Sequence, residues 1–208
     1  VYKRQLIGAE KPVIVVGQGV RYGGAAAELL QLAERLQIPV AASASGLGAL
    51  PGEHPLSLGL VQRGGTYQAN HACRQADVLL AIGVRFDDRT SSSWIPGYSF
   101  TIPPTRLIHV DIDPEEIGRN YPVALGLMAD VRTFLRQILA ELDRRGQDVL
   151  PAEARGEWLK QINDYRRKWD AFVAPGMVDD STPINPQRAA VEIDKALPED
   201  AVLVSDIG

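Results

Sequence analysis

Three polar segments of this 208-residue chain each follow an apolar run, and their residue types suit nucleotide binding. Gly17-Gln18-Gly19 lies between the apolar run Val13–Val16 and a helical stretch, where backbone amides and a helix N-terminus can hold a phosphate. The full dinucleotide fingerprint would need a glycine at Tyr22, and no acidic residue follows the second apolar run to hold a ribose. A nicotinamide-dinucleotide site is therefore disfavoured, while a tight structural turn and a nucleotide-binding loop remain equally open.

The second segment is Gly83-Val84-Arg85-Phe86-Asp87-Asp88-Arg89, at the end of another apolar run. Arg85 or Arg89 can neutralise a diphosphate or face a flavin ring, and Asp87 can orient one of the two arginines. The alternative is a salt-bridged surface loop. The residues alone slightly favour that alternative.

The third segment, His109-Val110-Asp111-Ile112-Asp113-Pro114, ends a further apolar run with two carboxylates. Asp111 can accept hydrogen bonds from a ribose or an adenine, whereas Asp113 is suited to cap a short helix that begins with Pro114. Because Asp113 already lies in the turn after the strand, an acid–base pair or a metal site is the less favoured interpretation here.

The remaining chemistry-bearing residues lack catalytic spacing. His54, His71 and His109 show no metal-ligand pattern, so we expect structural roles for them. Cys73, the single cysteine, falls within a helical pattern and is expected in the core; one cysteine excludes a disulfide framework and a cysteine-based zinc site. No nucleophile-elbow or Walker sequence occurs. The chain therefore contains no predicted catalytic or metal-binding residue.

The polar segments must be positioned by the elements around them, which alternate between strand and helix patterns. This alternation predicts an α/β fold, a mainly parallel sheet covered by helices on both faces. Ligands bind such sheets at the carboxyl ends of their strands, where the three segments lie. The patterns place strands at 12–17, 38–42, 77–83, 106–112 and 124–129, and helices at 25–36, 66–75, from 113 onward and at 131–142.

After Arg145 the character of the sequence changes. A surface helix is predicted, with Trp158, Ile162, Tyr165, Trp169 and Phe172 along one side and charges of both signs elsewhere. The final helix and strand cannot bury a core alone, so we expect them to begin a second α/β domain. The expected order is a linker at 146–155, the surface helix at 157–172, an extended proline-punctuated connection at 174–186, a helix at 185–197 and a strand at 201–204.

Composition restricts the class of protein. With 22 basic and 26 acidic residues, the net charge of −4 argues against a nucleic-acid partner, whose binding needs a basic face. The apolar runs are strand-sized and no secretory signal is present, so we expect a cytoplasmic protein without membrane contact. The chain begins at Val1 without a methionine and stops at Gly208 after an apolar run, so we expect both ends to be cut.

Taken in order, these motifs resemble the central domain of the thiamine-diphosphate enzymes of the acetolactate synthase type. The resemblance covers residues 8 to 145, and the tail from Asn185 to Gly208 resembles the first helix and strand of that family's C-terminal pyrophosphate-binding domain. The motifs that carry it are Pro12-Val13-Ile14-Val15-Val16-Gly17-Gln18-Gly19-Val20, Ile38-Pro39-Val40, Gly46-Leu47-Gly48, His54-Pro55-Leu56-Ser57-Leu58-Gly59, Ala69-Asn70, Ala76-Asp77, Gly83-Val84-Arg85-Phe86-Asp87-Asp88-Arg89 and Ile108-His109-Val110-Asp111-Ile112-Asp113-Pro114-Glu115-Glu116-Ile117-Gly118.

The resemblance implies a Rossmann-like, DHS-like NAD/FAD-binding domain within a three-domain enzyme. Residues 1–7 would be an N-terminal remnant, 8–145 the central domain, 146–184 a linker with a surface helix, and 185–208 the truncated start of the C-terminal domain. Thiamine diphosphate and Mg²⁺ would be bound by domains outside this chain. The thiamine ylid attacks a 2-keto acid, carbon dioxide leaves, and the resulting carbanion passes to an acceptor keto acid. Homodimers or homotetramers, a regulatory subunit and a place in branched-chain amino acid biosynthesis are also implied.

The central domain of several family members holds FAD, and the resemblance carries that site onto this sequence. Residues 17 to 19 and Ser43 would lie at the diphosphate, the arginine-rich segment along the flavin and ribityl region, and the last three positions near the adenosine. The residues concerned are Gly17, Gln18, Gly19, Ser43, Arg85, Asp87, Arg89, Asp111, Ile112 and Asp130.

Two segments depart from the family pattern. Gln62-Arg63-Gly64-Gly65-Thr66 stands where acetolactate synthases carry Gly-Met-His-Gly-Thr, so Arg63 and Gly64 replace a methionine and a histidine near the flavin. The loop from Thr90 to Pro96 also differs from the usual Val-Thr-Gly. The alternatives are therefore another member of the superfamily (a glyoxylate carboligase, an oxidase or a 2-keto acid decarboxylase) and a structural domain without flavin. The family's catalytic glutamate and its Gly-Asp-Gly magnesium motif lie outside this chain, which by itself should be inactive.

Overall fold

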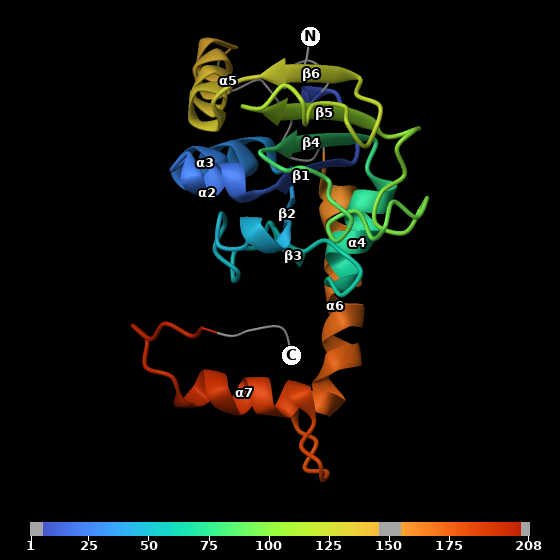
Figure 1. Cartoon of the computed structure of the whole chain (residues 1–208), viewed down its shortest axis with the longest axis vertical. Coiled ribbons are helices and arrows are strands. Elements are labelled where there is room, and N and C mark those ends of the chain that lie inside the picture. Colours follow the sequence, from blue (N-terminus) through green and yellow to red (C-terminus); the bar gives the residue numbers. More distant parts are fainter. Residues whose placement is uncertain (1–5, 146–154, 205–208) are drawn as a thin grey trace. The chain divides into compact units, whose positions relative to one another are not determined.

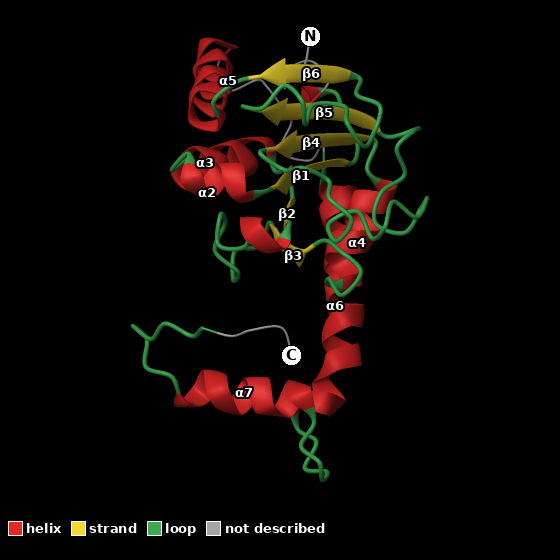
Figure 2. Cartoon of the chain, in the orientation of Figure 1, coloured by secondary structure: helices red, strands yellow, loops and turns green. Residues whose placement is uncertain are grey.

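The computed structural model describes residues 6–145 and 155–204 of the chain. The chain divides between Arg166 and Arg167 into two compact units. Figure 1 colours the chain along its sequence, and Figure 2 separates its helices from its strands.

The first unit is built on a six-stranded sheet in the order β3-β2-β1-β4-β5-β6 (Figures 1 and 2), and every pair of neighbouring strands is parallel. The chain therefore starts at β1, moves outward to β3, and then returns to the other side of β1 at β4. This order is that of dinucleotide-binding folds and confirms the predicted α/β, Rossmann-like architecture. The strands are β1 (Pro12–Val16), β2 (Val40–Ala42), β3 (Ser57–Leu60), β4 (Val78–Ile82), β5 (Arg106–Asp111) and β6 (Leu125–Met128).

Helices cover both faces of the sheet, as predicted. On one face lie α2 (Gln18–Tyr22), α3 (Ala26–Leu36) and α5 (Val131–Arg145); on the other lie α4 (Tyr67–Gln75) and the start of α6 (Gly156–Met177) (Figure 1). Successive residues of β1 alternate between the two cores: Ile14 packs with the α3 and α5 side chains, and Val15 with the α4 side chains and Trp158. Burial on both faces explains why the central strands are uninterrupted apolar runs.

Thr66 caps α4, because its hydroxyl accepts a hydrogen bond from the Ala69 amide at 3.4 Å and donates one to the Leu58 carbonyl at 2.6 Å. Cys73 is fully buried on this helix, as expected, and burial raises the pKa of its thiol. The strand β3 was not among the predicted elements. Gly59 there has a φ of +78° and the register with β2 shifts, so the alternation of apolar residues is broken.

Two buried charged side chains form hydrogen bonds between segments of the first unit that are far apart in the sequence. Arg155 is 3% exposed, and its guanidinium donates hydrogen bonds to the backbone carbonyls of Leu36 and Leu6. Burial lowers the pKa of Arg155 to about 10, which still leaves it protonated at neutral pH. On α3, Glu28 is 7% exposed and accepts hydrogen bonds from Arg132 at 2.8 Å and Arg136 at 2.9 Å on α5.

The prediction of a helix from Asp113 onward is wrong, because residues 114–118 form turns. The Asp111 carboxylate accepts a hydrogen bond from the Asp113 amide, and the Asp113 carboxylate accepts one from the Glu115 amide. Gly118 then adopts a φ of +76°. Asp113 therefore caps a turn, and the left-handed residue diverts the chain before a helix can form.

From α6 onward, the expectations drawn from the sequence hold in part. Trp158, Ile162 and Tyr165 are buried as predicted, but Phe172 is 73% exposed and Val173 is buried instead. The helix α6 also continues through Pro175 to Met177, so the connection begins later than predicted. The proline removes one backbone hydrogen bond, and only two residues of the helix follow it. The helix α7 (Pro186–Ala196) is confirmed, with Asn185 as its cap.

Residues 201–204 are not a strand. A strand needs a partner for its backbone groups, and no described segment pairs with these residues. Their side chains are exposed, Val202 and Val204 at 87%. The expected linker at 146–155 lies outside the described residues except for Arg155, and so does most of the expected remnant at 1–7. Among the helices of the described ranges, none combines the length and the apolar character needed to cross a bilayer.

Candidate functional site

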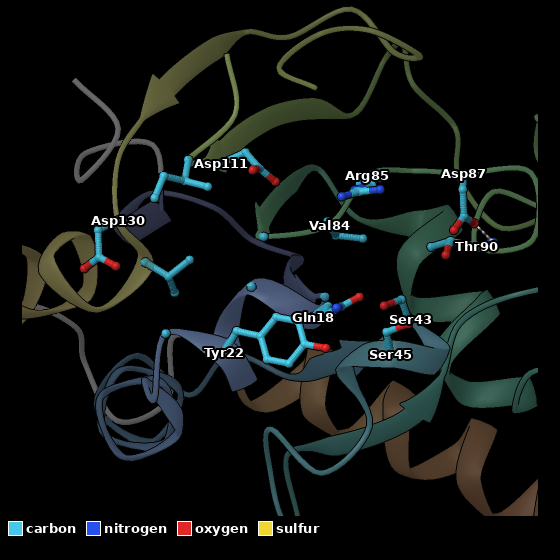
Figure 3. A pocket seen from close by; sticks show the side chains of 16 residues that line it. Gln18, Tyr22, Ser43, Ser45, Val84, Arg85, Asp87, Thr90, Asp111 and Asp130 are labelled. Carbon is cyan, nitrogen blue, oxygen red and sulfur yellow. Dashed lines mark hydrogen bonds between the residues drawn. The ribbon is translucent and has the colours of Figure 1, made fainter. Parts of the chain in front are cut away.

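A pocket of about 500 Å³ opens at the carboxyl ends of the central strands (Figure 3). It lies where the loops after β1 and β4 separate in opposite directions, which is the ligand-binding position of open α/β sheets. Nine of the ten predicted cofactor residues line it. The lining residues are Gly17, Gln18, Gly19, Tyr22, Gly23, Ser43, Ser45, Gly83, Val84, Arg85, Asp87, Thr90, Asp111, Ile112, Asp130 and Val131.

The glycines of the first motif are required by packing between two loops. A Cβ on Gly17 would lie 2.1 Å from the Gly83 carbonyl oxygen, and a Cβ on Gly19 would lie 2.8 Å from the Gly83 Cα. The Gly17 amide donates to the Ile82 carbonyl at 3.1 Å and the Gly19 amide to the Gly83 carbonyl at 3.2 Å. These two amides are therefore already paired, and the structural explanation of the glycines holds. The same contact forms the floor of the pocket.

The arginine-rich loop is not a salt-bridged surface loop. Within the described ranges, neither Arg85 nor Arg89 forms an ion pair with a carboxylate. Asp87 instead accepts a hydrogen bond from the Thr90 amide at 2.8 Å, and this contact orders the turn that follows. Arg85 is exposed and faces the pocket, whereas Arg89 is exposed and outside the pocket lining, so its role stays a prediction.

Two carboxylates lie toward the other end of the pocket (Figure 3). Asp111 ends β5 and is 8% exposed, and Asp130 precedes α5 and accepts a hydrogen bond from the Thr133 amide at 2.8 Å. Hydrogen bonds from Thr133 lower the pKa of Asp130, so it is ionised at neutral pH. Ile112, between the two elements, leaves 70% of its surface exposed at the pocket. This end offers acceptors beside an apolar surface.

The residue after Arg85 belongs to a buried aromatic cluster outside the pocket lining. Phe86 adopts a φ of +53°, is buried, and packs edge-on against Phe100, His109 and Tyr121 at ring distances of 5.3 to 5.4 Å. Burial lowers the pKa of His109, whose Nε2 lies 2.9 Å from the Val84 carbonyl oxygen. A neutral, buried imidazole bonded to the backbone has the structural role expected for it.

The other histidines also have local partners. His54 Nε2 lies 3.3 Å from Glu34 Oε1, and His71 stacks on Tyr67 at 3.9 Å. Within residues 6–145 and 155–204, no group of three or more potential ligands could hold a metal ion.

Sequence reasoning missed several residues of the pocket lining: Tyr22, Gly23, Ser45, Thr90 and Val131. Gly23 and Val131 meet only because α2 and α5 pack together, a contact without a sequence signal. Thr90 could have been found, because an aspartate three residues before it is typical of a capped turn. Tyr22 occupies the position of the third fingerprint glycine, and that substitution alone does not predict a pocket contact.

Fold and pocket together define a Rossmann-like α/β domain with a pocket at the carboxyl ends of its parallel strands. Residues 3–138 match the family model described as "Thiamine pyrophosphate enzyme, central domain". The chain belongs to this family of thiamine pyrophosphate enzymes and carries their central domain.

Relatives of the chain include large subunits of acetolactate synthases. It is 36% identical over 206 residues to the "Probable acetolactate synthase large subunit" of Methanocaldococcus jannaschii, covering 96% of this chain and 33% of that protein. It is 34% identical over 207 residues to the "Acetolactate synthase isozyme 3 large subunit" of Escherichia coli K12, covering 98% of this chain and 34% of that protein. The chain thus spans about a third of the length of these relatives.

Proposed function

We propose that the pocket binds FAD and that the chain is the central part of a thiamine-diphosphate-dependent carboligase of the acetolactate synthase type. The observation that carries the proposal is the convergence of nine residues predicted for the cofactor site, from the carboxyl ends of five strands, on one pocket at the switch point of the sheet. The pocket volume of about 500 Å³ falls within the roughly 300–1,000 Å³ of small-molecule and cofactor sites.

The charges of the pocket suit a dinucleotide diphosphate. Arg85 faces the pocket without a carboxylate partner among the described residues, so its charge is available to a phosphate group. Asp111 and Asp130 can accept hydrogen bonds from ribose hydroxyls at the opposite end. Ser43 replaces the acidic residue that would hold a nicotinamide-dinucleotide ribose at the end of β2, which favours a flavin over a nicotinamide cofactor.

The whole-protein activity rests on segments beyond this chain. Thiamine diphosphate with Mg²⁺, held by flanking domains, would supply carbanion chemistry on a 2-keto acid. This chain would contribute the flavin-binding domain at 8–145, a linker at 146–184 and the start of the C-terminal domain at 185–208, and would be inactive alone. The relatives are named large subunits, which supports a regulatory small subunit as partner. Self-association of the chain and a cytoplasmic location are further parts of the proposal.

A titration of the chain with FAD tests the flavin site. Replacing Arg85 with alanine removes a charged hydrogen-bond donor, so the dissociation constant should rise about 10- to 150-fold. Arg106, exposed at the amino end of β5 and outside the pocket lining, gives the matched control Arg106→Ala, which should bind like the wild type. Wild-type chain that takes up no FAD would refute the proposal and favour the alternative of a structural domain without flavin.

The specific reaction is tested separately, in the full-length protein with pyruvate as donor. Acetolactate would support the carboligase. Acetaldehyde or acetate would instead identify a decarboxylase or an oxidase of the same superfamily, the alternative that the Arg63 segment leaves open.

A further inference from the structure

We propose that Tyr22 forms a stacking platform for the adenine of the bound dinucleotide, an inference that rests on the flavin-binding function proposed above. Position 22 is where a dinucleotide fingerprint carries its third glycine, and a tyrosine there adds a large flat ring at the pocket.

The Tyr22 ring has no aromatic or hydrogen-bonding partner among the residues that the structure describes. It lines the pocket and is 82% exposed. Among the described residues, the ring stacks on no other aromatic ring, and the hydroxyl makes no hydrogen bond. The ring face is therefore accessible to a ligand that enters the pocket.

The backbone beneath Tyr22 is fixed. It is the last residue of α2, whose Val20 is fully buried and whose Gly19 packs against Gly83. The next residue, Gly23, donates from its amide to the Gly19 carbonyl at 2.9 Å. Side-chain rotation can therefore adjust the ring while its attachment point stays in place.

The backbone that carries Tyr22 lies toward the carboxylate end of the pocket. A Cβ on the neighbouring Gly23 would lie 3.8 Å from the Val131 Cβ and 4.0 Å from an Asp130 carboxylate oxygen. Figure 3 shows the ring on the side of Gln18 away from Asp87.

The surroundings favour the purine end of the ligand. The carboxylates of Asp111 and Asp130 can accept hydrogen bonds from ribose hydroxyls and an exocyclic amine, while Ile112 and Val131 add apolar contact for a base. Arg85, suited to the diphosphate, lies farther along the pocket (Figure 3). A phenol ring at this end therefore meets the adenine rather than the isoalloxazine.

Binding of FAD and of FMN to the same chain separates the two ends of the ligand, because FMN lacks the adenylate. Aromatic–base stacking predicts that Tyr22→Ser raises the dissociation constant for FAD about 5- to 150-fold and leaves that for FMN unchanged. Tyr22→Phe, which keeps the ring, should bind FAD like the wild type. Tyr98→Ser, at an exposed tyrosine outside the pocket lining, controls for the loss of a surface ring.

An unchanged FAD constant in Tyr22→Ser would overturn the inference, since the ring would then contribute nothing. Equal weakening for FAD and FMN would also overturn it, because the lost contact would belong to the flavin end. If the wild-type chain binds neither flavin, the proposed function itself fails, and that result differs from both of the others.

Discussion

Replacing Gly17 with alanine should lower the free energy of unfolding of the first unit by more than a surface substitution does. The new methyl carbon would lie 2.1 Å from the Gly83 carbonyl oxygen and 2.7 Å from the Val84 Cα. Both distances are well short of the ~3.5 Å at which such atoms attract one another. Both neighbours are backbone atoms, so no side chain can rotate away to make room.

The strain can be relieved only by separating the loops after β1 and β4. That movement would stretch the hydrogen bonds from the Gly17 amide to Ile82 and from the Gly19 amide to Gly83. Overpacking costs about 1 to 3 kcal/mol, and each weakened hydrogen bond adds roughly 1 kcal/mol. We therefore expect the free energy of unfolding to fall by about 3 to 5 kcal/mol.

Urea denaturation followed by circular dichroism measures this change as a shift of the midpoint at constant slope. Gly52→Ala is the control, because a Cβ at Gly52 would meet no atom within 4 Å. It should stay within about 0.5 kcal/mol of the wild type. If Gly17→Ala and Gly52→Ala have the same midpoint, the two loops are not packed as described, and the structural explanation of the motif fails.

Three further predictions concern stability, each measured by urea denaturation. Arg155→Met keeps the buried stem but leaves two carbonyls without their donor, so the free energy of unfolding should fall by about 1 to 3 kcal/mol; an unchanged value would contradict the buried contact. Hydrogen bonding, chiefly from Arg132, lowers the pKa of Glu28 from 4.5 to about 2, so its contribution is complete above pH 4.5 and disappears as the pH falls toward 2. Glu28→Gln should therefore lose stability at pH 6 and approach the wild type at pH 2 to 3, whereas a constant difference would show that ionisation is irrelevant. Thr66→Ala removes the cap of α4, so the free energy of unfolding should fall by about 1 to 2 kcal/mol; an unchanged urea midpoint would contradict the capping contact.

The central part of the fold could be predicted because each of its strands carries its own signal. Residues 12–16 and 78–82 are apolar throughout, since both faces of the sheet are covered, and such runs are hard to mistake. β3 lacks that signal, because Gly59 interrupts it and only Leu58 is buried. The strand expected at 201–204 shows the opposite error, since an apolar run becomes a strand only where another strand pairs with it.

The site was predictable as far as strand ends could locate it. Knowing that Gly17, Arg85 and Asp111 follow parallel strands is enough to bring them to one edge of a sheet. Which partner each polar group selects was not predictable. Asp87 bonds to a backbone amide three residues later instead of a nearby arginine, because local turn geometry outweighs an exposed ion pair.

The contact between Gly17, Gly19 and Gly83 also restricts how this sequence can change over evolutionary time. Where two side chains touch, one can grow while the other shrinks, and the pair then varies in a correlated way. Two glycines in contact have nothing left to shrink, so no compensating substitution exists for either. These positions should therefore be constant among homologues instead of covarying, and a method that infers contacts from covariation would not detect the tightest contact at the pocket.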